Sequence, residues 1–373
     1  MADRRELRVL MTADTIGGVW TYALELTGEL DARGVRVALA TMGAPLTRAQ
    51  RRRLCGLKSL VLYESTYRLE WMKDAWKDVG HAGDWLLALE RRFRPDLVHL
   101  NQFAFGALPF EAPTLMVAHS CVVSWWRAVH GEDPPPGWNI YRQKVTQGLA
   151  GAGLVVAPSR AMLQSLAHDY GDQTTGLVIG NGRSPALFQP GAKRPFILAA
   201  GRLWDEGKNL AALQAVAPHL PWPVRVAGST SHPDGAAVMP SSLECLGELS
   251  TEALASQLAG AAIYALPARY EPFGLSVLEA ALSGCALVLG DIASLREIWG
   301  AAALYVEPND HGALRATLGR LIESPADRTR LGEAARSRAL CFTPRRMADD
   351  YLGAYALLEP AFAATTRKEM QCA

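Results

Sequence analysis

Residues 262–310 read AIYALPARYEPFGLSVLEAALSGCALVLGDIASLREIWGAAALYVEPND. Short apolar runs at Ile263–Pro267, Ala286–Leu289 and Leu304–Val306 predict buried strands, and the segment Leu275–Ser283 predicts a helix between the first two. Strands that alternate with helices need crossover connections, and such connections produce a parallel sheet. This stretch therefore predicts an α/β domain, in which ligands bind at the carboxyl ends of the strands.

The same alternation extends along the rest of the chain. Strands are predicted at 8–14, 35–42, 60–63, 96–100, 115–119, 154–157, 177–179, 196–200, 224–227 and 245–247, helices at 20–33, 72–93, 210–217, 251–259, 312–323, 326–338 and 345–358, and a helix N-cap at Ser159. Residues 183–195 (RSPALFQPGAKRP) contain three prolines and one glycine, which predicts a linker. The predicted fold class is α/β, with two Rossmann-like doubly wound parallel-sheet domains at 1–185 and 193–342 and a C-terminal helix at 343–360.

Composition excludes several classes of protein. The chain has 373 residues, and 38 Lys+Arg against 37 Asp+Glu give a formal net charge of +1, which argues against a general nucleic-acid binder. A hydrophobic content of 49% argues against disorder. No apolar run reaches the roughly 18–20 residues of a spanning helix, and the start MADRRELRVLM lacks a signal-peptide pattern. Six scattered cysteines without a CxxC pair indicate reduced thiols in a cytoplasmic protein: Cys55, Cys121, Cys245, Cys285, Cys341 and Cys372.

Several nucleotide-binding and catalytic motifs are absent from the sequence. There is no GxxxxGK[ST], no GxSxG and no HExxH, and the glycines of GAGLVV (Gly151–Val156) precede a predicted strand instead of following one. There is also no Asp-x-Asp motif, a carboxylate cluster of the kind that holds a diphosphate through a divalent metal. We therefore predict no metal site, and expect Arg, Lys and helix dipoles to neutralise any bound diphosphate.

Two loops in the first half contain candidate ligand-binding residues. In Asp14–Trp20 (DTIGGVW), Gly17 and Gly18 lie between a strand and a helix, where the backbone can approach a phosphate or sugar closely. An ordinary turn is the favoured interpretation of this glycine pair taken alone. In VAHS, His119 could hydrogen-bond a sugar hydroxyl or balance a developing charge, although a lone histidine at a strand end is more often structural.

Two loops in the second half contain the charged candidates. In GRLWDEGKN, Arg202 and Lys208 flank a turn after a strand, where two cations can cancel much of a diphosphate's charge; two solvated cations are an equally good interpretation. In RYEPFGLSVLE, Glu271 lies in a loop before a helix whose first N–H groups suit phosphate or sugar oxygens. Glu279 follows in the second turn, where a carboxylate can accept both hydroxyls of a ribose, or be only a surface residue.

Taken together, these segments resemble the retaining family-4 glycosyltransferases of the GT-B fold, and the resemblance covers most of the chain. Its strongest part is 262–310, which is similar to the donor-site signature of that family. GRLWDEGKNL resembles the family's diphosphate loop, VIGNGRSPALFQP its linker entry, PDLVHLN a first-domain strand and CFTPRRMADDYLGAY its closing helix. The resemblance implies an N-terminal acceptor domain, a C-terminal nucleotide-sugar domain facing it across a cleft, and a last helix that crosses back to the first domain.

The resemblance also implies a role for each candidate residue. Arg202 and Lys208 would hold the donor diphosphate and Glu279 the ribose; Glu271, Pro272 and the amides of Phe273, Gly274 and Leu275 would hold the donor sugar and phosphate; Gly17 and Gly18 would line the cleft, and His119 would lie beside the reacting sugar. His119, Arg202, Lys208 and Glu271 form the predicted catalytic set. Three positions depart from the family pattern: Ser120 replaces a common Asp, Ala268 a common Ser, and Gly182-Arg183 the usual Gly-Val or Gly-Thr.

The predicted activity is metal-independent transfer of a hexose, with retention, from a nucleotide diphosphate sugar to a hydroxyl acceptor on a glycan, lipid or small molecule. A UDP-sugar is favoured over a GDP-sugar as co-substrate, and no cofactor is expected. Two alternatives stay open: a catalytically inactive sugar-nucleotide-binding subunit, and another GT-B enzyme such as a nucleotide-sugar epimerase or glycan phosphorylase. Neither a nucleic-acid partner nor a particular oligomeric state is predicted.

Two first-half features bear on the acceptor. Aromatic residues are crowded at Tyr63, Tyr67, Trp71, Trp76 and Trp125-Trp126, where they could stack on an acceptor, although core packing is expected for at least half of them. The basic cluster at Arg48 and Arg51–Arg53 is more typical of a solvated helix face than of contact with an anionic acceptor or a membrane. Peripheral contact with the inner face of the membrane therefore stays open beside a simple cytoplasmic location.

Overall fold

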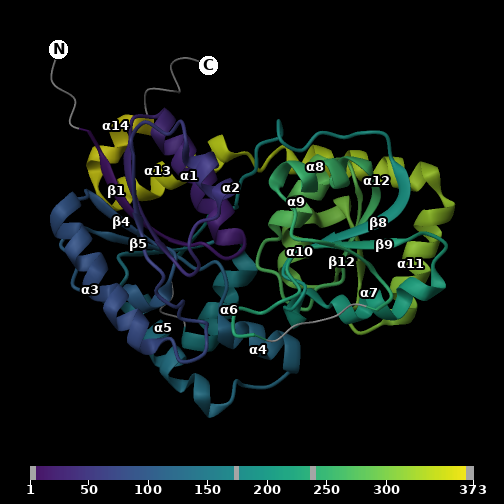
Figure 1. Ribbon diagram of the computed structural model, residues 1–373, viewed down its shortest axis with the longest axis horizontal. Helices are drawn as coiled ribbons and strands as arrows, with labels where there is room; N and C mark the ends of the chain where they lie inside the picture. The colour runs from purple at the N-terminus through teal and green to yellow at the C-terminus, as the bar shows by residue number, and fades with distance from the viewer. Residues whose placement is uncertain (1–5, 172–175, 236–240, 367–373) are drawn as a thin grey trace. The chain divides into compact units, whose positions relative to one another are not determined.

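The computed structural model describes residues 6–171, 176–235 and 241–366 (Figure 1). The chain divides into two compact units. Unit 1 consists of Met1–Ser124, Asp133–Gly182 and Pro344–Ala373, and unit 2 of Trp125–Glu132 and Arg183–Thr343. The structure thus groups residues 125–132, which the sequence prediction assigned to the first domain, with unit 2.

Unit 1 contains a seven-stranded parallel sheet with the order β3-β2-β1-β4-β5-β6-β7. The strands are β1 (Arg8–Asp14), β2 (Arg36–Met42), β3 (Leu60–Glu64), β4 (Leu97–Leu100), β5 (Thr114–Val117), β6 (Leu154–Ala157) and β7 (Gly176–Val178). Strand β1 is central and pairs in parallel with both β2 and β4. The strand order reverses direction between β1 and β4, so the loops that follow these two strands meet at a topological switch point.

Helices cover both faces of this sheet, as Figure 1 shows for α1 (Gly18–Ala32) and α13 (Pro344–Leu358) on one side and α3 (Trp76–Phe93) and α5 (Asn139–Gly151) on the other. Side chains alternate along β1: Val9 joins the core beneath α1 and α13, and the next residue, Leu10, joins the core beneath α3 and α5. Burial on both faces explains why the strands of this parallel sheet are apolar runs. The remaining unit 1 helices include α2 (Arg48–Leu54), α6 (Arg160–Tyr170) and α14 (Ala363–Thr366), and α4 (Val122–His130) begins in this unit.

Unit 2 contains a six-stranded parallel sheet with the order β10-β9-β8-β11-β12-β13. The strands are β8 (Arg194–Ala200), β9 (Val224–Ala227), β10 (Glu244–Gly247), β11 (Ala261–Leu266), β12 (Ala286–Gly290) and β13 (Leu304–Val306). The helices are α7 (Leu210–Val216), α8 (Thr251–Gly260), α9 (Leu275–Leu282), α10 (Ala293–Trp299), α11 (His311–Glu323) and α12 (Pro325–Ala339). The strand order reverses between β8 and β11, which creates a second switch point.

The core of unit 2 also has two layers. Leu198 of β8 packs in the cluster that includes residues of α8, α9 and α12, and its neighbour Ile197 packs in the cluster that includes residues of α7 and α11. Figure 1 shows these helices on opposite sides of the sheet. The predicted α/β fold with two doubly wound parallel sheets is therefore confirmed.

Some predicted element boundaries were wrong for local reasons. The first helix begins at Gly18, two residues before the predicted start, because Gly17 (φ 87°) acts as its N-cap. The helix predicted from residue 72 begins only at Trp76, because Asp74 adopts a left-handed backbone (φ 52°) that ends a turn. The strand predicted to reach His119 ends at Val117. The N-cap at Ser159 is confirmed, because its side chain accepts a hydrogen bond from the Met162 amide at 3.2 Å.

Two further expectations concern the membrane and the cysteines. Over the ranges 6–171, 176–235 and 241–366, no helix has both the length and the apolar character that a membrane crossing needs. Cys55, Cys121, Cys245, Cys285 and Cys341 are free thiols, and Cys372 lies outside the described residues.

Candidate functional site

The two charged loops of unit 2 follow β8 and β11, the strands on either side of its switch point. The carbonyl oxygen of Gly207 accepts hydrogen bonds from the amides of Arg269 (2.9 Å) and Tyr270 (3.2 Å), which joins the loops directly. Asn209 adds a side-chain link, because its Nδ2 donates to the carbonyl oxygens of Pro267 (2.8 Å) and Pro308 (2.7 Å). The positions of the charged side chains are therefore set by backbone contacts between strand-end loops.

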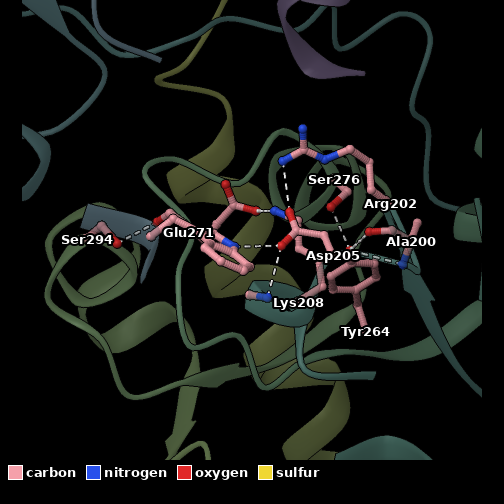
Figure 2. Close-up of polar contacts among 10 residues, drawn as sticks. Ala200, Arg202, Asp205, Lys208, Tyr264, Glu271, Ser276 and Ser294 are labelled. Atoms are coloured by element: carbon pink, nitrogen blue, oxygen red, sulfur yellow. Dashed lines mark hydrogen bonds and ion pairs between the residues drawn. The ribbon is translucent and has the colours of Figure 1, made fainter. Parts of the chain in front are cut away.

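The catalytic candidates of unit 2 lie together in two ion pairs (Figure 2). Arg202 Nη2 donates to Asp205 Oδ2 at 2.8 Å, and Lys208 Nζ donates to Glu271 Oε2 at 2.5 Å. The Glu271 carbonyl oxygen accepts a hydrogen bond from Ser294 Oγ at 2.6 Å, which fixes the backbone of this loop. The structure thus brings Arg202, Lys208 and Glu271 into one cluster, as the sequence predicted, and adds Asp205.

Asp205 is the centre of this cluster, a role that the sequence did not reveal. Its Oδ1 accepts hydrogen bonds from Trp125 Nε1 (2.8 Å) and the Gly207 amide (2.9 Å). Burial alone would raise the pKa of Asp205, but the cations of Arg202 and Lys208, together with these hydrogen bonds, outweigh burial and lower it below its usual value. The carboxylate is therefore ionised and orients Arg202.

The charge of the cluster is balanced, with two cations facing two carboxylates. Each cation has more N–H donors than the one that its carboxylate partner accepts, because a guanidinium carries five and an ammonium three. The side chain of Arg202 is 35% exposed, and that of Lys208 is 16% exposed. The arrangement can therefore accept an anion without losing the contacts that position it.

Helix α9 contributes a further positive end to this region. It begins at Leu275, and Gly274 is its N-cap with φ 88° and ψ 68°, a left-handed conformation that favours glycine. A Cβ at Gly274 would also lie 3.0 Å from Val277 Cγ2 and 3.4 Å from Glu271 Cγ. The first amides of a helix have no intrahelical acceptor, so Phe273, Gly274 and Leu275 supply donors next to Glu271.

Glu279 lies in the second turn of α9, and its side chain is 8% exposed. Its Oε1 accepts a hydrogen bond from Arg183 Nε at 2.7 Å, and the Arg183 side chain is only 2% exposed. The predicted ribose-binding carboxylate is therefore half of a buried ion pair, which the sequence analysis did not foresee. The unusual Arg183 in the linker was the signal that could have indicated it.

In unit 1, the candidate residues follow β1, β4 and β5 at the other switch point. Gly17 and Gly18 form the start of α1 after β1, and His119 follows β5. Asn101, after β4, donates from its backbone amide to Thr12 Oγ1 (2.8 Å) and from Nδ2 to the Thr12 carbonyl oxygen (2.5 Å). Its Oδ1 lies 2.7 Å from His119 Nε2.

These contacts determine the tautomer of His119. The Thr12 carbonyl can only accept, so the amide nitrogen of Asn101 faces it and the amide oxygen faces His119. His119 Nε2 must then donate its proton. Burial lowers the pKa of His119 to about 3, so the ring is neutral near pH 7 and its Nδ1 is a hydrogen-bond acceptor. Of the two roles the sequence offered, this geometry favours hydrogen bonding to a hydroxyl over charge balance.

Most of the other first-half candidates have structural partners. Tyr63, Tyr67, Trp71 and Trp76 are partly buried and pack against the core of unit 1 beneath α3, as expected for at least half of the aromatic residues. The basic cluster forms α2, where Arg51 pairs with Glu64 (Nη2 to Oε2, 2.7 Å) and Arg53 lies 3.6 Å from Glu25. Within the described ranges, no three His, Cys, Asp or Glu side chains converge as metal ligands would.

Consecutive parts of the chain match the models of two protein families. Residues 16–186 match Glycosyltransferase Family 4, and residues 186–338 match Glycosyl transferases group 1. The two matches meet at residue 186, close to the change from unit 1 to unit 2 between Gly182 and Arg183.

Two curated relatives match parts of the chain. An MMP alpha-(1->4)-mannosyltransferase of Mycolicibacterium hassiacum is 41% identical over 95 residues, which cover 25% of this chain and 23% of that protein. A glycogen synthase of Mycobacterium tuberculosis is 28% identical over 285 residues, covering 68% of this chain and 66% of that protein. The matched part of this chain thus spans less than two thirds of the length of either relative.

Solved structures share the fold along nearly all of the chain. A sucrose-phosphate synthase from Thermosynechococcus elongatus has a TM-score of 0.80 at 19% identity, with 96% of this chain and 100% of that chain covered. Anabaena HepE, solved in complex with UDP and glucose, has a TM-score of 0.72 at 15% identity, with 95% and 100% covered. At these identities the likeness establishes the fold.

We expect Asp205→Asn to lower the free energy of unfolding by about 1.5–3 kcal/mol at pH 7, because the hydrogen bonds to an ionised Asp205 are lost. Since the folded-state pKa of Asp205 is depressed, the difference should be complete above about pH 5 and should fade as the pH falls below the unfolded value of about 3.9. Urea unfolding of the Asp205→Asn variant and of the unsubstituted protein at pH 7, 5 and 3.5 measures this difference in the free energy of unfolding. The exposed Glu333→Gln is the control, and equal losses at every pH would contradict the assignment.

We expect His119 to remain neutral and protonated on Nε2 between pH 5 and 8, because burial opposes its charge and Asn101 accepts the Nε2 proton. Histidine ring ¹⁵N shifts report both the tautomer and the titration. Asn101→Ala removes the acceptor and should redistribute the tautomers. A titration midpoint for His119 between pH 5 and 8, or an Nδ1-protonated ring in the unsubstituted protein, would refute this tautomer.

Proposed function

The chain belongs to the group 1 glycosyltransferases of the GT-B fold, and we propose that it transfers a hexose from a nucleotide diphosphate sugar to a hydroxyl acceptor, with retention at the anomeric carbon. The proposal is supported above all by one observation. The two cations, Arg202 and Lys208, lie with Glu271 at the switch point of unit 2, where doubly wound sheets bind nucleotides.

The leaving nucleoside diphosphate gains negative charge as the bond between the anomeric carbon and the phosphate oxygen breaks. Arg202, Lys208 and the amides at the start of α9 would stabilise that charge, because they are held in place before the reaction begins. Asp205 and Glu271 would keep the two cations oriented. The sequence has no Asp-x-Asp motif, so we propose that these groups act without a divalent metal.

Retention is proposed through attack on the same face from which the phosphate leaves. The acceptor oxygen forms the new bond to the anomeric carbon, and its proton passes to the departing phosphate oxygen. In this scheme Glu271 binds the donor sugar, and the neutral His119 is an acceptor, through Nδ1, for a hydrogen bond from a substrate hydroxyl. A UDP-sugar is the preferred donor, which is consistent with the UDP and glucose bound to HepE.

An inactive nucleotide-sugar-binding subunit and an epimerase or phosphorylase are the competing functions. Thermal shifts with UDP, GDP and ADP sugars test donor binding, because a ligand of the folded state raises its stability. Release of nucleoside diphosphate is then followed with and without a panel of sugar, lipid and small-molecule hydroxyl acceptors. Release that depends on an acceptor supports transfer. Binding without release across the panel supports the inactive subunit, and a converted donor sugar without release supports epimerisation.

Lys208→Ala should reduce turnover about 10²–10³-fold at saturating donor, the usual cost of removing one preorganised charge-stabilising group. Initial rates with the best acceptor of the panel measure this loss, and circular dichroism confirms that the variant is folded. Lys144→Ala, at an exposed position of α5, is the matched control. Normal turnover by folded Lys208→Ala would overturn the role of Lys208 in catalysis.

A further inference from the structure

We propose that Arg183 is a positioning residue for donor binding, which holds the Glu279 carboxylate ionised and oriented toward the ribose of the nucleotide. This inference rests on the proposed function and goes beyond it, because it assigns a role to a linker residue outside the donor motifs. It also predicts how the protein recognises the ribose, and this prediction can be wrong even if the protein binds sugar nucleotides.

The first argument is the geometry of Arg183. Its Nε donates to Glu279 Oε1 at 2.7 Å, and the side chains are 2% and 8% exposed. Its guanidinium carbon lies 4.9 Å from the centre of the Phe188 ring, and its backbone amide donates to the Phe342 carbonyl oxygen at 3.0 Å. Arg183 is thus held on three sides within unit 2, and the carboxylate that it contacts is held with it.

The second argument is electrostatic. Transferring an ion from water into a protein interior costs several kcal/mol, and attraction between partners offsets this cost only when their geometry is good. A buried carboxylate without a cation becomes protonated, because burial disfavours the charged form. A protonated carboxyl would have to use one oxygen as a donor. An ionised one offers acceptors only, which is what two ribose hydroxyls, both donors, require.

The third argument is the sequence position. The resemblance places valine or threonine where this chain has Arg183, and neither residue carries a charge. The buried arginine at this position therefore departs from the family pattern that the sequence resembles. The carboxylate with which Arg183 forms an ion pair is that of the ribose candidate, Glu279.

The test compares ribose recognition in matched variants. Isothermal calorimetry measures the dissociation constants of UDP and 2′,3′-dideoxy-UDP, and their ratio reports the contribution of the ribose hydroxyls. We expect the unsubstituted protein to bind UDP roughly 10–100-fold more tightly, the range for hydrogen bonds to a charged group. In Arg183→Met and in Glu279→Gln the ratio should fall to within about threefold of unity. Arg183→Lys, which retains the charge, should restore most of the discrimination.

Arg225→Met is the control for a general structural effect. Arg225 also stacks on a ring, with its guanidinium carbon 4.3 Å from the centre of Phe196, and also pairs with a glutamate, Glu244, at 2.8 Å. The Arg225→Met variant should leave the ratio of the dissociation constants of 2′,3′-dideoxy-UDP and UDP unchanged. If Arg183→Met does not fold, the double variant Arg183→Met/Glu279→Gln removes both buried charges, and Arg183→Lys provides a folded comparison.

The outcomes separate the two proposals. If Arg183→Met or the double variant keeps the ribose discrimination of the unsubstituted protein, the role of Arg183 is wrong and the proposed function stands. If the unsubstituted protein binds UDP without discriminating the dideoxy form, the ribose role of Glu279 fails, and the role of Arg183 fails with it. If neither UDP nor the GDP and ADP alternatives bind at all, the proposed function itself fails.

Discussion

The Gly207 carbonyl accepts two amides from the loop after β11, and the charged cluster of unit 2 depends on this contact. It joins the loops that follow β8 and β11, the two strands between which the sheet order reverses. Together with the hydrogen bonds from Asn209 to Pro267 and Pro308, it fixes the loop that carries Arg202 and Lys208 against the loop that carries Glu271. The close packing also explains glycine here, because a Cβ at Gly207 would lie 2.9 Å from Trp125 Nε1 and 3.0 Å from Asp205 Oδ1.

Charge in this unit is organised by pairing, not by excess. Arg202 and Asp205, Lys208 and Glu271, and Arg183 and Glu279 form three ion pairs at different degrees of burial. Arg202 is the most exposed of these cations, whereas Arg183 is buried against Glu279 and Phe188. The anion site that we propose needs no net positive charge in the chain, because Asp205 and Glu271 hold Arg202 and Lys208 in place.

Much of the fold followed from local pattern. All the strands predicted in 262–310 are present, because a strand buried on both faces is a continuous apolar run that sequence alone reveals. Helices α4, α5 and α10 were missed, and α6 was represented only by its N-cap, Ser159. The candidate residues of the donor motifs were found together in unit 2, since motif loops after parallel strands meet at one edge. Asn101 and Arg183 were missed as partners because each contacts a residue distant in sequence, and the central role of Asp205 was missed because it includes a contact with Trp125, 80 residues away.

The sequence by itself determined the alternation of strands and helices and the residue types placed at the strand ends, because these depend on local periodicity and on loop composition. The tertiary structure alone decided which of these residues touch. Asn101 lies 18 residues from His119 and orients its ring, and Arg183 lies 96 residues from Glu279 and neutralises its charge. Tautomer, ionisation and orientation depend on contacts across such separations, and no local pattern encodes them.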